Sequence, residues 1–471
     1  MLDNIVEKLN SIITISNDIL WTYVLIAPLI LLGLYFTFKT NFVQFRYIKE
    51  MFRLLTDGAT SKKEEGSVSS FQAFCISTAS RVGTGNLAGI AIAISVGGPG
   101  AIFWMWLIAL IGSASSFVES TLAQIYKESN GKGAYIGGPA YYMAKALNMK
   151  WMGIIFSILI TICFGLVFNS VQSNTISLAL NEAFGVNRTF TGIILTVLTL
   201  LIIFGGIHRI AKVSEVMVPI MAIAYILVAL FVVVTNITKI PGIITLIFEN
   251  AFGFKQAIGG GIGSALLIGI KRGLFSNEAG MGSAPNAAAT ANTSHPVKQG
   301  LIQTLGVFTD TIVICSCTAF IILLSDVDLS SGLTGIQLTQ NALSSQIGSF
   351  GSIFIAICVL LFAFSSIVGN YYYGEANIEF LSKKKIYVTL YRIFVALMVL
   401  FGATVSMDIV WNLADVFMAL MAITNLIAIA LLGKFAFKAL EDYRSQKKAG
   451  IKDPVFKSSS IPELKNVTEW D

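Results

Sequence analysis

Long apolar runs recur along almost the whole chain, and they constrain its fold more than any other feature. Hydrophobic residues make up 55% of the 471 residues and charged residues only 12%, whereas soluble domains carry about 25% charged residues. Runs of about 18 apolar residues are long enough to cross a bilayer. We therefore predict an all-α polytopic membrane protein with about 11 transmembrane helices, at 19–38, 69–96, 101–126, 152–180, 190–207, 213–235, 256–280, 299–325, 351–374, 386–404 and 409–433.

Basic residues are distributed unequally between the loops on the two sides of these spans. Of 32 Lys and Arg residues, 25 fall on one side, four fall on the other, and three lie within or at the ends of spans. Because cytoplasmic loops of membrane proteins are enriched in Lys and Arg, we predict a multi-pass protein of the cytoplasmic membrane with its N-terminus outside and its C-terminus inside. The net charge of +6 then indicates a basic face beside anionic lipid, and we expect no nucleic-acid partner.

Several classes of function are disfavoured by missing motifs. The chain has five cysteines and two histidines without metal-site spacing, so we expect no transition-metal site. It has no H-E-x-x-H, G-x-S-x-G or Walker A sequence, so we expect neither an enzyme nor a nucleotide-driven pump. An ion channel is an alternative hypothesis, but the sequence lacks a repeated pore loop or a ring of charges. The N-terminus lacks a basic region with a cleavage site, so we expect its first span to be retained.

Two spans are interrupted by glycines and polar residues. The span at 69–96 contains "SRVGTGNLAG", and the span at 256–280 runs into "GGGIGSALLIGIKRGLFSNEAGMGSAPNAA". Irregular backbone at membrane depth is tolerated where it is buried in protein or lines a cavity. A broken helix exposes N–H groups that hold a carboxylate and carbonyls that hold a cation. Close helix packing at small residues is the simpler alternative for either span alone.

The positions of the two broken spans indicate an inverted repeat. After the first helix, residues 69–235 and 236–433 each contain five expected spans, and each block opens with a broken span. Because five is odd, the second block begins on the opposite side of the membrane, as in many secondary transporters. We therefore divide the chain into an N-terminal helix and cytoplasmic loop (1–68), these two five-helix repeats, and a disordered cytoplasmic tail (434–471).

Four segments resemble the alanine or glycine:cation (sodium:alanine) symporter family of bacterial and archaeal amino-acid carrier proteins. They are "GTGNLAGIA", "GIKRGLFSNEAGMGSAPNAAA", "FAFSSIVGNYYYGE" and "VWNLADVFMALMAITNLIA", and the resemblance runs from about Gln72 to Leu432. It implies a leucine-transporter-type 5+5 inverted repeat preceded by one extra helix. It also implies sodium-coupled import of a small neutral amino acid, with sodium as the coupling ion and no other cofactor. We expect the chain to function as a monomer in the lipid bilayer.

The resemblance also assigns residues to a site. For sodium it implies the carbonyls of Ala79 and Val82 and the hydroxyls of Ser365 and Ser366. For the amino acid it implies residues around the two breaks and on the span between them: Gly83, Thr84, Gly85, Phe168, Gln172, Gly273, Phe275, Ser276 and Asn277.

Asn370 departs from the family pattern, in which tryptophan is common at this position. An amide in place of the large ring widens the pocket and adds a donor and an acceptor. The chain is therefore expected to carry alanine or glycine by family default, with glutamine as a competing substrate. Lithium or proton coupling stays open.

Four charged residues within or beside the spans are candidates for gating or for structural charge pairs. We expect Arg81 to form an inner gate or a structural ion pair, and Asp310 to serve either helix packing or an ion or proton role. Glu278 is expected to pair with Lys271, Arg272 or a free helix end. Asp415 is expected to lie either at an outer gate or on the surface.

Overall fold

The computed structural model describes residues 11–60, 67–131, 134–253 and 262–470, and apart from one two-stranded hairpin its regular elements are helices. Eight helices in these ranges are long and apolar enough to cross a membrane: 11–39, 101–125, 150–184, 206–235, 296–323, 350–381, 385–404 and 407–448. Two shorter apolar helices cover 85–97 and 188–203. The apolar runs therefore form the long helices that the sequence predicts.

The elements follow one another along the chain with few long connections. In order they are η1 (Ile19–Leu25), α2 (Ile26–Lys39), α3 (Val43–Arg46), α4 (Ile48–Thr60), α5 (Ser70–Arg81), η2 (Gly85–Gly89), α6 (Ile90–Gly97), α7 (Ala101–Ile125), β1 (Glu128–Ser129), β2 (Tyr135–Ile136), α8 (Pro139–Lys145), α9 (Lys150–Ile160), η3 (Thr161–Phe168), α10 (Asn169–Phe184), α11 (Arg188–Ile203), α12 (Gly206–Thr235), η4 (Ile237–Lys239), α13 (Ile240–Ala251), α14 (Ile262–Asn277), α15 (Ala284–Ala288), α16 (Pro296–Val307), η5 (Phe308–Cys315), α17 (Ser316–Leu323), α18 (Gly335–Ile347), α19 (Phe350–Leu381), α20 (Lys385–Thr404), α21 (Met407–Lys448) and η6 (Ser458–Ser460).

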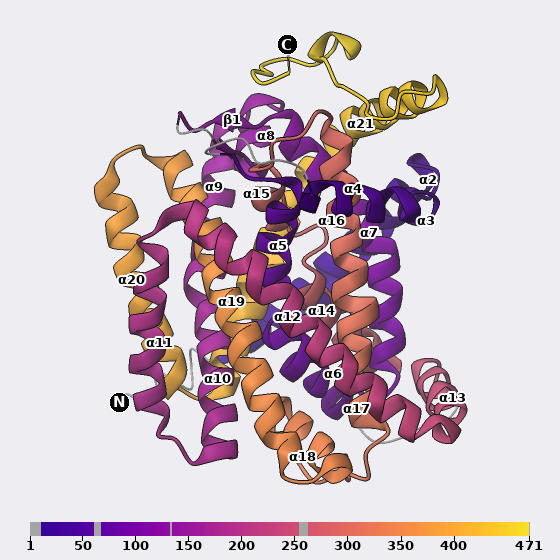
Figure 1. Ribbon diagram of the computed structural model, residues 1–471, viewed down its shortest axis with the longest axis vertical. Coiled ribbons are helices and arrows are strands. Elements are labelled where there is room, and N and C mark those ends of the chain that lie inside the picture. The colour runs from indigo at the N-terminus through magenta and orange to yellow at the C-terminus, as the bar shows by residue number, and fades with distance from the viewer. Residues whose placement is uncertain (1–10, 61–66, 132–133, 254–261, 471) are drawn as a thin grey trace.

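The long helices pack into a bundle whose two ends differ (Figure 1). Helix α7 packs against α14 and α16, and α10 packs against α19 and α20. We call the end that carries α8, the hairpin β1–β2 and residues 450–470 the α8 end, and the opposite end, with α13, the α18 end. Glycine permits the close approach of α20 to α10, because a Cβ on Gly402 would lie 2.3 Å from the Ser170 carbonyl oxygen.

The C-terminal tail differs from the sequence expectation of disorder. Helix α21 continues to Lys448, and residues 450–470 fold back over the α8 end (Figure 1). Phe456, Ile461 and Trp470 are buried, with 3%, 2% and 6% of their surfaces exposed. The prediction of disorder was wrong because it weighed the polar composition of the segment and overlooked three apolar anchors that bury against the bundle.

Candidate functional site

The first break lies between α5 and η2, as the glycine-rich motif predicts. Helix α5 ends at Arg81, and the backbone leaves the helical region at Val82, which has φ −80° and ψ 83°. The Gly83 N–H donates to Asn86 Oδ1 at 3.0 Å, and the Thr84 N–H donates to Gln172 Oε1 at 2.9 Å. Two side-chain amides thus satisfy N–H groups that the break frees.

An oxygen cluster joins this break to α19. The Ser366 hydroxyl donates to the Ala79 carbonyl at 2.7 Å and lies 3.0 Å from the Phe362 carbonyl, to which Ser365 donates at 2.8 Å. Gly83 lies so close that a Cβ there would be 2.2 Å from Ser366 Oγ. Carbonyl and hydroxyl oxygens are the ligand type that hard cations prefer. The Phe362 carbonyl was missed from the sequence because a backbone oxygen leaves no residue-type signal.

The second break lies a few residues later than the sequence prediction. Helix α14 continues through Asn277, and positive φ angles follow at Glu278 (57°), Gly280 (84°) and Gly282 (83°) before α15 begins. Two of these positions are glycines, which adopt this conformation without a steric penalty. Placing the break around Gly273 was wrong. That glycine lies within α14 and packs against α7, because a Cβ there would be 2.8 Å from Ile108 Cγ2.

Glu119 of α7 binds the backbone of this second break. Its carboxylate accepts hydrogen bonds from the N–H groups of Gly280 (3.1 Å) and Gly282 (3.0 Å) and from Asn425 Nδ2 (2.8 Å). The side chain is fully buried. Successive N–H groups around glycines of positive φ form a concave anion site, and here an internal carboxylate occupies it. This contact joins residues 161 positions apart, so no local sequence signal indicates it.

Asp310 connects the two breaks. Its carboxylate accepts from Asn86 Nδ2, which belongs to η2, and from the hydroxyls of Ser276 and Thr311, both at 2.7 Å. Ser276 is in the last turn of α14, so one buried carboxylate holds both broken spans. The sequence left two roles open for Asp310, helix packing or an ion or proton role. These hydrogen bonds are those of a packing contact between helices. Asn86 stood in the glycine motif, but the sequence assigned it no partner.

Among the described residues, Arg81 has carboxylates around it but no direct ion pair. Its guanidinium donates to the Gln303 carbonyl at 3.1 Å and to Ser116 Oγ at 3.4 Å, and 2% of its surface is exposed. Glu119, Glu278 and Asp310 interact with it electrostatically at longer range.

Glu278 has other partners than those predicted from the sequence. It accepts hydrogen bonds from Ser80 Oγ at 2.9 Å and Ser283 Oγ at 2.6 Å, whereas Lys271 and Arg272 contact Asp415. The pairing expected with Lys271 or Arg272 was wrong, because α14 carries its two cations toward the α18 end, while Glu278 follows the end of that helix and bonds Ser283, the N-cap residue of α15.

Asp415 and an aromatic stack lie on the α18 side of the breaks. The Asp415 carboxylate pairs with Arg272, lies 3.5 Å from Lys271 Nζ and is 3% exposed, so the surface alternative was wrong. The rings of Phe168, Phe275 and Trp411 form a continuous stack, with neighbouring centroids 4.6 and 4.7 Å apart. The Arg272 guanidinium lies 4.8 Å from the Trp411 ring. The charge pair and the ring stack therefore form one layer.

Several buried polar atoms beside the breaks have no hydrogen-bond partner among the described residues. They include Asn370 Nδ2, Asn277 Nδ2 and Thr84 Oγ1. The Asn370 oxygen, by contrast, accepts from Ser80 Oγ at 2.7 Å, which fixes the amide beside Glu278. Because buried polar groups are normally paired, these atoms are available to a polar ligand.

The structure thus brings the predicted residues of both broken spans, of the η3–α10 junction and of the middle of α19 together in the bundle interior, with Gly273 as the exception. Gly85 lies against Phe275, because a Cβ there would be 2.8 Å from that ring. The residues that sequence reasoning missed are Ser80, Asn86, Glu119, Phe362 and Trp411, which hold or cover the breaks.

Comparison with known proteins places these observations in context. The chain matches the model of the sodium:alanine symporter family over residues 6–458. It is 60% identical to a Bacillus subtilis protein named "Probable sodium/glutamine symporter GlnT", across 98% of this chain and 96% of that one. It is 58% identical to the B. subtilis "Amino-acid carrier protein AlsT", across 98% of both. It is 38% identical to the "Sodium/alanine symporter AgcS" of Methanococcus maripaludis, across 90% of this chain and 94% of that one.

Solved structures share the fold at low sequence identity. The crystal structure of MhsT in complex with L-phenylalanine superposes with a TM-score of 0.59 at 16% identity, covering 80% of this chain and 96% of that one. This likeness shows a shared fold, which in this chain is a bundle of helices long and apolar enough to cross a membrane.

Proposed function

The chain belongs to the sodium:alanine symporter family, and from this premise we propose that it imports a neutral amino acid together with sodium by alternating access. The family consists of multi-pass membrane transporters, which agrees with the long apolar helices of this chain. The observation that carries the proposal is the meeting of two broken spans at buried, partly unpaired polar atoms beside an oxygen cluster.

The proposed architecture is one helix followed by two inverted five-helix repeats. The extra helix ends with α2. The first repeat contains α5–α6, α7, α9–α10, α11 and α12, and the second contains α14–α15, α16–α17, α19, α20 and α21. Each repeat opens with a broken span, as expected when the site lies between pseudo-symmetric halves. The proposed orientation puts the α8 end in the bacterial or archaeal cytoplasm and the N-terminus outside, with a single chain as the functional unit.

The buried charges around the breaks and a gate on their α18 side favour a cation-coupled carrier over a channel. Three buried carboxylates, from Glu119, Glu278 and Asp310, surround one buried guanidinium, that of Arg81. If all are ionised, the cluster has an excess negative charge that a bound cation offsets. We assign the aromatic stack and the Arg272–Asp415 pair, which lie on the α18 side of the breaks, to a closed gate. An alternating-access carrier requires such a closed gate, whereas a conducting channel requires a continuous path.

Replacing Ser366 by alanine is expected to weaken sodium coupling. Ser366 Oγ is the hydroxyl that bridges α19 to the Ala79 carbonyl of α5, so its loss removes one ligand from the proposed sodium site. In proteoliposomes with an imposed sodium gradient, we expect the sodium concentration for half-maximal uptake of labelled alanine or glutamine to rise about tenfold. If uptake by the unmodified chain does not depend on the sodium gradient, the symport proposal itself is wrong.

Ser365→Ala is the matched control for this test. Ser365 donates to the same Phe362 carbonyl, but its other contact is Met221 Sδ of α12 at 3.8 Å. We therefore expect a smaller rise in the sodium requirement for Ser365→Ala than for Ser366→Ala. Equal sodium requirements in Ser366→Ala and the unmodified chain would remove Ser366 from the sodium site.

Glutamine is the substrate that we favour over alanine. Beside the first break, Asn370 offers an amide whose nitrogen has no partner among the residues that the structure describes, and an amide is complementary to the side-chain amide of glutamine. A relative 60% identical to this chain is named for glutamine. Other relatives, however, are named for amino acids in general or for alanine, which keeps alanine as the second candidate.

Replacing Asn370 by tryptophan is expected to lower glutamine uptake relative to alanine uptake. A ring would fill the space that the longer substrate needs, and pocket changes of this kind shift selectivity by about tenfold or more. Competition by unlabelled glutamine and alanine against one labelled substrate measures the ratio. The variant Asn370→Ala separates the effect of pocket size from that of hydrogen bonding to the substrate, because it enlarges the pocket and removes the amide. Unchanged glutamine preference in both variants would show that Asn370 does not set selectivity.

A further inference from the structure

Lys127 and Trp470 form a close contact at the α8 end, outside the site described above. The Lys127 ammonium lies 3.9 Å from the centroid of the Tyr135 ring and 4.6 Å from that of the Trp470 ring. Trp470 donates its indole N–H to the Gln124 carbonyl at 2.8 Å. The aromatic faces favour a cation between them, so Trp470 fixes where the lysine points.

Lys127 in turn holds the end of the second broken span. Its Nζ donates to the Ala291 carbonyl at 3.0 Å, and Gln124 Nε2 donates to the same carbonyl at 3.0 Å and to that of Ala288. Burial lowers the pKa of Lys127 to about 7, against an opposing effect of Glu469. The contact with Ala291 does not depend on the charge, because a neutral amine also donates a hydrogen bond.

The same few residues join the two broken spans to each other. The Asn292 N–H donates to the Val68 carbonyl at 2.9 Å, and Val68 pairs with Ala291 in an isolated β-bridge. Val68 lies just before Ser69, the N-cap residue of α5, and Ala291 follows α15. At the α8 end, the ends of both broken spans therefore meet at one small contact, which Lys127 holds from the side of α7.

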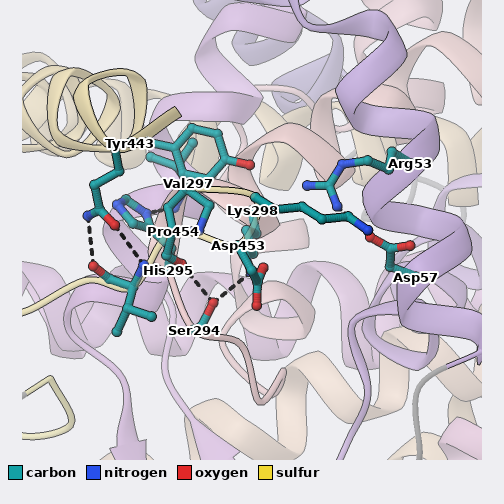
Figure 2. Close-up of polar contacts among 12 residues, drawn as sticks. Arg53, Asp57, Ser294, His295, Val297, Lys298, Tyr443, Asp453 and Pro454 are labelled. Atoms are coloured by element: carbon teal, nitrogen blue, oxygen red, sulfur yellow. Dashed lines mark hydrogen bonds and ion pairs between the residues drawn. The ribbon is translucent and has the colours of Figure 1, made fainter. Parts of the chain in front are cut away.

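A second anchor of the tail lies on the loop between α15 and α16 (Figure 2). His295 caps α16 by accepting the Val297 N–H on Nδ1 at 3.2 Å, so its Nε2 carries the hydrogen that faces Asp442 Oδ2 at 3.1 Å. The Phe456 ring packs edge-on against His295, and the Phe456 N–H donates to the Ser294 carbonyl. Lys298 pairs with Asp453 of the tail. Burial lowers the pKa of His295 although Asp442 opposes the shift.

We propose that residues 450–470 form a latch that holds the α8 end of the carrier closed, with Trp470 and Lys127 as its positioning residues. Release of Trp470 would free Lys127 from Ala291, and the Val68–Ala291 contact could then separate so that α5 and α15 part. The proposed latch rests on the proposed alternating-access function, because it assigns residues 450–470 a role in opening the α8 end during that cycle.

State-dependent labelling tests the latch without any transport measurement. Val68 is 1% exposed, so a cysteine in its place reports opening of this contact through its reaction with a water-soluble maleimide on the purified full-length protein. We expect Trp470→Ala to raise the labelling rate of Val68→Cys about tenfold, and Trp470→Phe, which keeps a ring over Lys127, to raise it less. The unmodified chain, labelled in parallel, gives the background from the native cysteines.

Glu463→Ala and Leu338→Cys are the matched controls. Glu463 belongs to the same tail but pairs with Lys438 at an exposed position away from Lys127, so its replacement should leave labelling at position 68 unchanged. Leu338 is fully buried in α18, so a cysteine there reports unfolding rather than opening of the latch. Labelling at 68 that does not respond to Trp470→Ala, or that rises together with labelling at 338, would overturn the proposal. These results are independent of whether sodium drives uptake.

Discussion

Replacing Arg81 by methionine is expected to abolish sodium-driven uptake and to lower the melting temperature of the purified protein. Methionine keeps an unbranched apolar stem but not the guanidinium that reaches Gly306, where a Cβ would lie 2.3 Å from Arg81 Nη1. It removes the one guanidinium near three buried carboxylates. Removing one partner from a buried charge cluster costs about 3–5 kcal/mol, so we expect uptake to fall by about 100-fold or more.

Arg392→Met provides the comparison for Arg81→Met. Unlike Arg81, Arg392 pairs directly with a glutamate, Glu375 at 2.9 Å, and its side chain is 18% exposed. Water screens such a pair, so we expect a smaller loss of stability and of uptake. Uptake that falls equally in the two variants would show that the cluster around Arg81 has no special role.

The membrane helices and the two breaks were predictable because their signals are local. Apolar runs must be helical in lipid, since their backbone groups have no other partners there. The break at Gly83 was placed correctly because its glycines coincide with the irregular backbone. The second motif contains more glycines than the break uses. The sequence therefore could not show that Gly273 serves helix packing while Gly280 and Gly282 adopt positive φ angles.

The partners of the buried charges were not predictable from the sequence, because they depend on contacts between distant helices. Glu119 reaches Gly280, which is 161 positions away, and Asp310 reaches Asn86 across 224 positions. The cations at 271 and 272 are closer in sequence to Glu278 than to Asp415, yet they pair with Asp415 because helix α14 presents them to the start of α21. The tail was misjudged for the same reason, since its anchors meet residues of α7 and of the α15–α16 loop.

Replacing Asp415 by asparagine is expected to disable the gate that faces the α18 end. Asp415 is the carboxylate that both Arg272 and Lys271 contact, and both cations are buried. An amide of the same shape leaves two positive charges without an anion, at a cost of about 3–5 kcal/mol. Because this pair lies beside the Trp411 ring of the aromatic stack, we expect the closed state to lose stability and uptake to fall about 100-fold.

The double variant Arg272→Met/Asp415→Asn separates a coupled ion pair from two independent contributions. With the guanidinium also removed, the asparagine no longer faces an unpaired Arg272, and a single buried cation, Lys271, is left at this position. We therefore expect the double variant to take up substrate faster than Asp415→Asn alone, although more slowly than the unmodified chain. Residues in one charge pair show such non-additivity, whereas independent residues give additive losses. Additive losses of uptake in this cycle would show that Arg272 and Asp415 do not act as one gate.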